Sequence, residues 1–169
     1  MVYLNGTPVP QSETAKYLGL HLDSRLNWRH HVRQKALQIS EKLRQMYWIV
    51  GRNAKTTLES KVLIYNSIIK PIWTYAIQLW GCTKSLNRLV IQHSQNKFLR
   101  CIVNAYRYTT NEVIHNDLKI KKINEVIKDF SIRYEQRLHC HPNVLAIELL
   151  DTELDIRRLK RKKPHELTM

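Results

Sequence analysis

Acidic residues are scarce in this sequence of 169 residues. Its 14 Asp and Glu stand against 28 Lys and Arg, which gives a formal net charge of +14 at pH 7. Such a surplus favours a polyanionic partner, either nucleic acid or an acidic membrane surface. A basic run at 157–163 carries part of this charge, but the remainder of the chain is also basic.

Long apolar runs, cysteine, glycine and proline are also sparse. No run of about 18 apolar residues occurs, which argues against a transmembrane span. The N-terminus lacks the basic-then-apolar pattern of a signal peptide. Three widely spaced cysteines argue against a disulfide framework and fit a reducing, intracellular compartment. With only four glycines and five prolines, the chain is expected to be mostly regular structure.

The first part of the chain has the pattern of short strands. Asn5-Gly6 separates two short segments at 2–4 and 7–9, which predicts a small hairpin with a type I′ turn. Residues 17–22 alternate between apolar and polar side chains and predict a further strand that can pair with this hairpin. Gly19 inside that strand indicates a bulge or a close approach of another backbone.

Helical periodicity begins at Trp28. Apolar residues then recur at three- and four-residue steps and predict one long helix that ends at Gly51, a natural C′ residue. Thr56 to Glu59 resembles a capping box that opens a second helix, which Pro71 kinks or splits before Gly81 ends it. The predicted buried positions of these two helices are Val32, Ala36, Ile39, Leu43, Met46, Val50, Leu58, Val62, Tyr65 and Ile69.

Further helices follow from the same pattern. One runs from about residue 83 or 85 to Ile102, a short one is capped by Thr109 with Glu112, and a third ends before Pro142. Residues 144–150 add one more turn, and the chain beyond Asp155 is expected to be disordered. The buried positions of the longer two are predicted to be Leu86, Leu89, Val90, Phe98, Ile102, Ile123, Val126, Ile127, Phe130, Tyr134 and Leu138. The fold class is therefore mainly α, with a short β element at the front.

The first long helix carries the clearest functional pattern. Between residues 25 and 55 the only acid is Glu41, whereas the basic residues are Arg25, Arg29, Arg33, Lys35, Lys42, Arg44, Arg52 and Lys55. On a helical wheel they flank the apolar stripe, so the helix can pack while offering charge to a phosphate backbone. The alternative is a solvated charged face. Leu37 and Trp48 point outward and indicate a packing surface rather than base stacking.

The remaining aromatic, histidine, cysteine and aspartate residues are not predicted to form a catalytic or metal site. Trp73, Tyr75 and Trp80 could stack on bases, but helical spacing favours a core cluster. The compact group His139-Cys140-His141 lacks the paired spacing of a zinc site, so no metal ligand is predicted. Asp23, Asp117 and Asp129 are isolated, whereas two-metal nucleotidyl transfer needs clustered carboxylates. Without a partner carboxylate, His30 and His31 are predicted to be polar surface, and no catalytic residue is predicted.

Two motifs carry a family resemblance. They are the segment Lys16-Tyr17-Leu18-Gly19-Leu20-His21-Leu22-Asp23, continued by Leu26-Asn27-Trp28-Arg29-His30-His31, and the segment Lys70-Pro71-Ile72-Trp73-Thr74-Tyr75, continued by Gln78-Leu79-Trp80-Gly81. Both resemble the C-terminal part of reverse transcriptases from non-LTR retrotransposons, most closely the jockey clade of insects. With gaps, the resemblance extends from about Val2 to about Leu150.

The resemblance implies a division of the chain. Residues 1–27 would end the palm, 28–81 would form a helical thumb, 82–150 the helical region after it, and 151–169 a basic, disordered tail. Lys16 would lie near the primer's phosphates, and Tyr17, Leu18 and Gly19 near its 3′ end. An ordinary buried edge strand is the competing interpretation of that segment.

The resemblance also implies a function. The parent enzyme is an RNA-directed DNA polymerase that uses Mg²⁺, yet no aromatic-x-Asp-Asp box occurs in this sequence. The chain would therefore bind no cofactor itself, would not polymerise alone, and would hold an RNA–DNA hybrid or DNA beside the palm and fingers of the polymerase. Neither a membrane nor a small-molecule substrate is expected as a partner.

Two other functions stay open. One is a stand-alone nucleic-acid-binding module domesticated from a retroelement. The other is a helical protein-interaction domain whose positive face meets an acidic partner or a membrane. The basic run at 157–163 fits a nuclear localisation signal, a nucleic-acid patch or a solvated end equally well.

Overall fold

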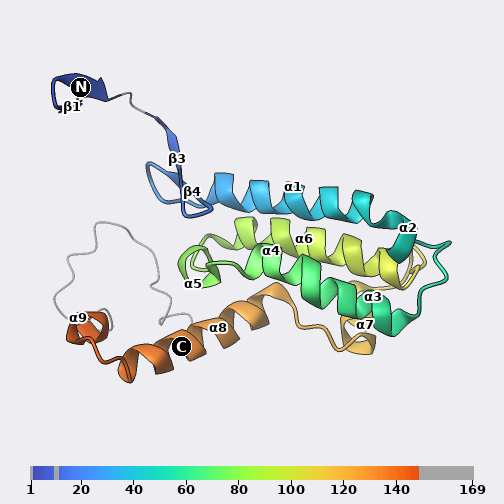
Figure 1. The fold of residues 1–169 in the computed structure, drawn as a ribbon. Coiled ribbons are helices and arrows are strands. Elements are labelled where there is room, and N and C mark those ends of the chain that lie inside the picture. The colour runs from blue at the N-terminus through green and yellow to red at the C-terminus, as the bar shows by residue number, and fades with distance from the viewer. Residues whose placement is uncertain (1, 10–11, 149–169) are drawn as a thin grey trace.

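The computed structural model describes residues 2–9 and 12–148 (Figure 1). It opens with the predicted hairpin, in which β1 (Val2–Leu4) pairs antiparallel with β2 (Thr7–Val9). Asn5 and Gly6 both have positive φ angles, as a type I′ turn requires. The predictions for the tail lie outside the described residues.

The next strand prediction was wrong in its pairing. Instead of joining the first hairpin, β3 (Thr14–Tyr17) and β4 (Leu20–Asp23) pair with each other. Leu18 and Gly19 form the turn between them, with φ angles of 45° and 76°. The positive φ of Gly19 thus serves a two-residue turn and not a bulge. All four residues of β3 are exposed, whereas Leu20 of β4 is buried against the helical core.

The first helix follows its predicted stripe. In α1 (Arg29–Gln45) Val32, Ile39 and Leu43 are buried. The prediction of one helix up to Gly51 was wrong, because the chain leaves helical geometry at Met46 before the short α2 (Tyr47–Val50). Gly51 ends the helix with a φ of −71°, so it is not the left-handed C′ residue expected. Close packing explains the glycine, because a Cβ there would lie 2.4 Å from the carbonyl oxygen of Tyr47.

The second helical segment is not split at Pro71. It runs through α3 (Leu58–Ile64), a π-helical turn η1 (Tyr65–Ile69) and α4 (Lys70–Thr74). A π-turn before the proline accommodates the missing N–H and the crowding of its ring. The break falls instead at Ala76, whose φ is 51°, before α5 (Ile77–Trp80). Leu58 was predicted to be buried but is 49% exposed, because it begins the helix at its open end.

Four helices complete the described chain: α6 (Ser85–Ile102), α7 (Asn111–Asp117), α8 (Ile123–His139) and α9 (Val144–Ile147). Thr110, one residue after the predicted cap, accepts a hydrogen bond from the backbone N–H of Val113. The burial of Phe98 and Ile102 is confirmed. The burial predicted for the first half of α6 was wrong, because Leu86, Leu89 and Val90 lie on its exposed side.

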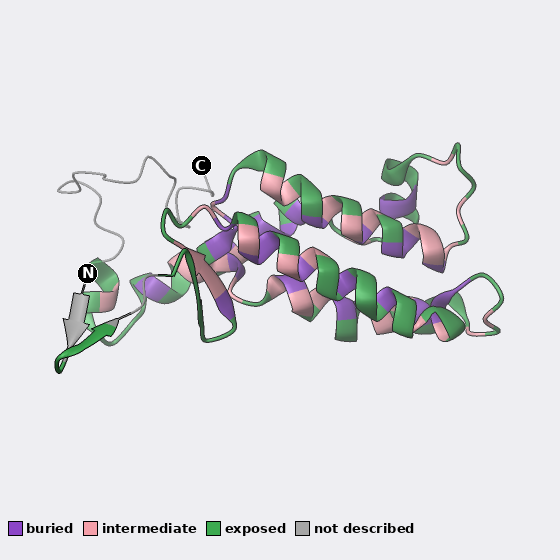
Figure 2. Ribbon diagram, turned by 90° about the horizontal axis from the view of Figure 1, so that it is seen from above, coloured by how far each residue is buried: buried purple, intermediate pink, exposed green. Residues whose placement is uncertain are grey.

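The core lies between α1, α4 and α6, and α8 closes it from below in the view of Figure 1. Buried surfaces of these helices face one another in Figure 2. Trp73, Trp80, Tyr65 and Phe98 are among its largest fully buried side chains. The amide of Gln95 donates to the Tyr65 hydroxyl at 2.8 Å, which satisfies one polar pair inside this core. Among the described residues, no helix is long and apolar enough to cross a membrane.

Candidate nucleic-acid interface

A basic, solvent-exposed side of α1 is the first part of the candidate interface. Arg29, Arg33 and Arg44 are exposed on one flank of this helix of 17 residues, and Lys42 is exposed on the other flank. At 1.5 Å per residue, the helix extends for about 25 Å. Within residues 2–9 and 12–148 the salt bridges join Lys to acids around α7 and α8, and none involves α1. The charge of this side is therefore not neutralised by ion pairs inside the described chain.

A groove opens at the start of α1. It has a volume of about 940 Å³ and lies between the ends of the β3–β4 hairpin, α1 and the first turn of α6. Arg29 and Arg33 line it together with Lys84, which directly precedes α6. Lys84 was missed by the sequence analysis because only the packing of α1 on α6 brings it beside the arginines. Glu13 and Asp23 also line this groove, so its charge is mixed at the hairpin end.

The predicted basic residues at the other end of α1 lie around the following loop. Arg52 and Lys55 are exposed there, and Arg52 Nε donates to Asn104 Oδ1 at 2.6 Å. Trp48 is 77% exposed and Leu37 is 57% exposed, so both point outward as predicted. The predicted basic residues thus fall into a group at the groove and a group near α2, with Lys42 and Arg44 between them.

Lys35 does not share this open surface. The Lys35 side chain is buried, and its ammonium lies 5.5 Å from the centre of the Tyr75 ring. Burial, aided by the charge of Lys16, lowers the pKa of Lys35. The prediction that Lys35 offers a free charge to phosphate conflicts with this placement, because the corner between α4 and α5 covers its flank of α1.

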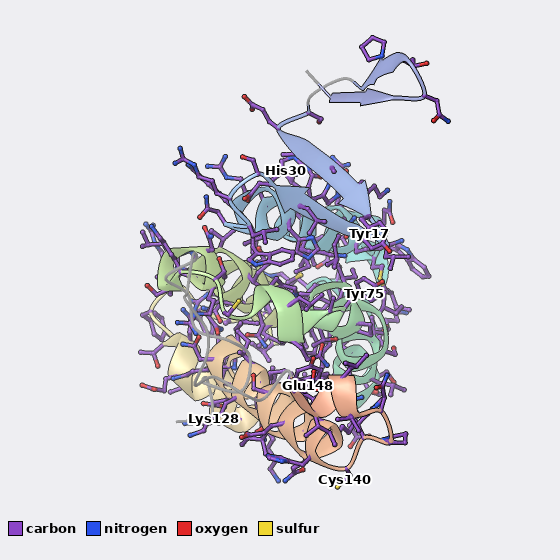
Figure 3. All side chains as sticks on the ribbon, turned by 90° about the vertical axis from the view of Figure 1, so that its left-hand side faces the viewer. Tyr17, His30, Tyr75, Lys128, Cys140 and Glu148 are labelled. Carbon is purple, nitrogen blue, oxygen red and sulfur yellow. The ribbon has the colours of Figure 1, made fainter. Side chains whose placement is uncertain are left out.

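The hairpin residues predicted to face the primer are exposed. Lys16, Tyr17, Leu18 and Gly19 surround the β3–β4 turn, and the Tyr75 hydroxyl donates to the Leu18 carbonyl oxygen at 2.7 Å. Figure 3 shows Tyr17 and Tyr75 on neighbouring elements at the same side of the molecule. The structure therefore joins the first family motif to the second.

The aromatic cluster separates into two environments. Trp73 and Trp80 are fully buried, which confirms their prediction as core. Tyr75 is 50% exposed, so its prediction as core was wrong. The chain turns at Tyr75 and Ala76, and this break in the helix directs the Tyr75 ring toward the hairpin while the indole Nε1 of Trp80 donates to the Tyr75 carbonyl oxygen.

His31 was also predicted wrongly. It is fully buried, not on the surface, and its ring lies near those of Trp28 and Trp80. Its Nδ1 accepts a hydrogen bond from the backbone N–H of His21 at 3.3 Å. Burial and the nearby charge of Lys35 lower the pKa of His31 to about 4, so the imidazole is neutral near pH 7. His30 is partly exposed.

Two of the isolated carboxylates, those of Asp23 and Asp129, have structural partners. Asp23 Oδ1 accepts backbone N–H groups of Arg25 and Asn27 and so closes the turn before α1. Asp129 forms a salt bridge with Lys121 at 2.6 Å. Within the part of the chain that the structure describes, no three His, Cys, Asp or Glu side chains gather in a way that could hold a metal ion. The arrangement presents charge and aromatic surface, which suits binding of a polyanion.

The chain is similar to three RNA-directed DNA polymerases of Drosophila melanogaster mobile elements. It is 38% identical over 168 residues to the probable enzyme of transposon X-element, 35% over 161 residues to that of transposon BS, and 33% over 174 residues to that of mobile element jockey. These alignments cover 95–98% of this chain.

The chain spans less than a fifth of the length of each relative, 18–19%. No protein-family profile matches it, and no solved structure matches it. The alignments extend over the hairpin, the basic helix and the helices packed on it, since nearly the whole chain is aligned. The chain therefore belongs to the family of RNA-directed DNA polymerases of non-LTR retrotransposons that includes jockey.

Proposed function

We propose that this chain holds the RNA–DNA template-primer of an RNA-directed DNA polymerase. The observation that carries the proposal is the exposed row of Arg29, Arg33 and Arg44 on one flank of α1, free of salt bridges within the described residues. A helix of about 25 Å can follow a phosphate backbone over several nucleotides. Contacts of this kind are electrostatic and independent of sequence, as a polymerase that copies any template needs.

The proposed arrangement assigns roles along the chain. The β3–β4 hairpin would meet the primer near its 3′ end through Tyr17, Leu18 and Gly19, with Lys16 at its phosphates. Residues 28–81 would act as the thumb, residues 82–150 would support it, and the groove beside Lys84 would receive backbone phosphates. Lys35 is assigned to structure, because it is buried against Tyr75.

Catalysis is assigned to another part of the polymerase. The carboxylates that hold Mg²⁺ for nucleotidyl transfer would come from a palm region, for which this chain shows no aromatic-x-Asp-Asp box. We expect no primer extension by the purified chain on an RNA template with Mg²⁺ and nucleotides. Extension by this chain alone would show that the assignment is wrong.

The binding proposal is tested by fluorescence anisotropy with a labelled RNA–DNA hybrid over a salt series. The test variant is Arg29→Glu/Arg33→Glu/Arg44→Glu. The matched control is Lys128→Glu/Arg133→Glu/Arg137→Glu on α8, where the three side chains are also exposed. Figure 3 shows Lys128 on the opposite side of the molecule from His30 at the start of α1. Both variants lower the formal charge from +14 to +8, so they have the same net charge and carry the change on different helices.

We expect the parent chain and the α8 variant to show the same slope of log binding constant against log salt concentration. In the α1 variant the magnitude of this slope should be smaller by roughly 3, one for each lost phosphate contact. Equal weakening by both variants would mean that net charge, and not the α1 surface, governs binding. That result would overturn the assignment of α1.

A protein-interaction role is the second candidate, and a separate observation favours it. Leu86, Leu89 and Val90 form an exposed apolar patch on the first half of α6, with 72%, 47% and 37% of their surfaces exposed. Such a patch marks a surface that another protein or domain covers. No hybrid binding at low salt by a folded chain would favour this role over the first.

A further inference from the structure

The loop between α6 and α7 presents two aromatic rings to solvent. Tyr106 and Tyr108 stack with their ring centres 5.4 Å apart and their planes within 5° of parallel. They are 70% and 83% exposed, so they add little to the core. An exposed aromatic pair of this size is unusual unless it meets a partner, because its apolar faces remain hydrated otherwise.

The loop is held in place by one side chain. The Arg100 guanidinium donates to the carbonyl oxygens of Tyr106, Arg107 and Thr109 and to Asn111 Oδ1, at distances from 2.8 to 3.3 Å. An arginine offers five N–H donors in a planar fork, so a single residue can fix several turns of backbone. The two tyrosines are therefore displayed on a braced loop, and binding there would cost little ordering entropy.

The surroundings of the pair are positively charged. Arg107 lies between the two tyrosines in sequence and is exposed, and Arg52 reaches the same loop through Asn104. Residues 103–111 contain no acid. Glu112, which follows them, is bound by Lys122 at 2.7 Å. A ligand that stacks on the rings would thus meet positive charge at its edges.

We infer that Tyr106 and Tyr108 form a stacking platform for the unpaired bases of single-stranded nucleic acid, with Arg107 and Arg52 attracting its backbone. Aromatic faces bind bases of any sequence, and basic side chains bind the phosphates between them. The loop lies near α2 and α7, at the opposite end of the helices from the β3–β4 hairpin (Figure 1). The platform goes beyond the proposed template-primer contact, because its ligand is unpaired and its residues are not on α1.

The test uses the full chain and a short labelled oligothymidylate, with an RNA–DNA hybrid measured in parallel. The variant Tyr106→Ala/Tyr108→Ala removes both rings, and Tyr106→Phe/Tyr108→Phe keeps them without the hydroxyls. A second probe replaces the thymidines by abasic sites, which retains the phosphates and removes the bases. Circular dichroism checks that each variant is folded.

We expect the alanine variant to bind the oligothymidylate about tenfold or more weakly than the parent, and the phenylalanine variant to bind like the parent. The parent should lose a similar factor on the abasic probe. Hybrid binding should be unchanged in the alanine variant, which separates this site from α1. Equal affinity of a folded alanine variant for the oligothymidylate, or equal affinity of the parent for the abasic probe, would overturn the stacking platform. An α1 variant that loses hybrid binding but keeps oligothymidylate binding would support the platform as a separate site.

Discussion

The Tyr75 hydroxyl donates a hydrogen bond of 2.7 Å to the carbonyl oxygen of Leu18, across 57 residues of sequence. The same ring lies beside Gly19 and under the ammonium of Lys35. A side chain at the corner between α4 and α5 therefore fixes the turn of the β3–β4 hairpin. The two family motifs depend on each other through this contact.

Replacing Tyr75 by Phe removes the hydroxyl but keeps the ring. We expect the free energy of unfolding to fall by about 1 kcal/mol. Amide hydrogen exchange in β3 and β4 should become faster, because the turn loses its anchor. Tyr108→Phe is the control, since its ring is 83% exposed. Unchanged exchange in the hairpin would mean that the bond to Leu18 does not hold it.

Leu18→Asn should stabilise the chain. Leu18 has a φ of 45° and is 69% exposed, so it bears left-handed strain and loses little burial on replacement. Asn-Gly is the preferred pair for this turn, and we expect a gain of about 0.5–1 kcal/mol in urea unfolding. Leu63→Asn, at an equally exposed helical position, should be mildly destabilising. A loss of stability in Leu18→Asn would contradict the turn geometry.

Acid should destabilise the fold through His31. Its folded pKa of about 4 lies below the unfolded value of 6.5, so the unfolded chain binds more protons between these values. The contribution of His31 to the free energy of unfolding is then fully present above pH 6.5 and declines toward pH 4. From about pH 7 to about pH 5 the His31 contribution should fall by about 2 kcal/mol.

The control for this pH effect is His31→Phe, measured by urea unfolding over the same range. His21, whose pKa is also lowered by burial, remains in that variant and leaves a smaller dependence on pH. The charged groups facing this cluster are Lys16 and Lys35, with His30 beside them. A variant as sensitive to acid as the parent would show that His31 does not cause the loss of stability.

Replacement by alanine should reduce stability far more at a buried tryptophan than at an exposed one. Trp73→Ala removes a fully buried ring and should cost about 3–5 kcal/mol. Trp48→Ala, at a position 77% exposed, should change stability by no more than about 0.5 kcal/mol. Thermal unfolding monitored by circular dichroism measures both. Similar losses in the two variants would show that Trp48 also packs in the fold.

Helix positions and their capping regions could be predicted because they depend on local periodicity. The stripe of Val32, Ile39 and Leu43 is an example, and so is the Asn5-Gly6 turn. Leu18 and Gly19 were not recognised as a turn, because leucine is a poor residue for positive φ and its strain is offset by contact with Tyr75. A contact between residues 57 positions apart cannot be read from a local sequence pattern.

The candidate interface was less predictable for a similar reason. A helical wheel places Lys35 and Arg33 on opposite flanks of one stripe, but it does not reveal which flank a later helix covers. Tyr75 covers Lys35, whereas Lys84 comes from another part of the chain to join Arg33. The His31 environment depends in the same way on Trp80, which is distant in sequence.

The exposed strand β3 has a consequence for how the chain behaves by itself. Within the described residues β3 pairs with β4 alone, so its outer edge presents N–H and C=O groups without strand partners. An edge of this kind is a template for further strands. In a longer polymerase the edge of β3 can extend a neighbouring sheet. In a concentrated solution of the isolated chain the same edge can pair with a second copy. Purification conditions that cover this edge should therefore keep the protein monomeric.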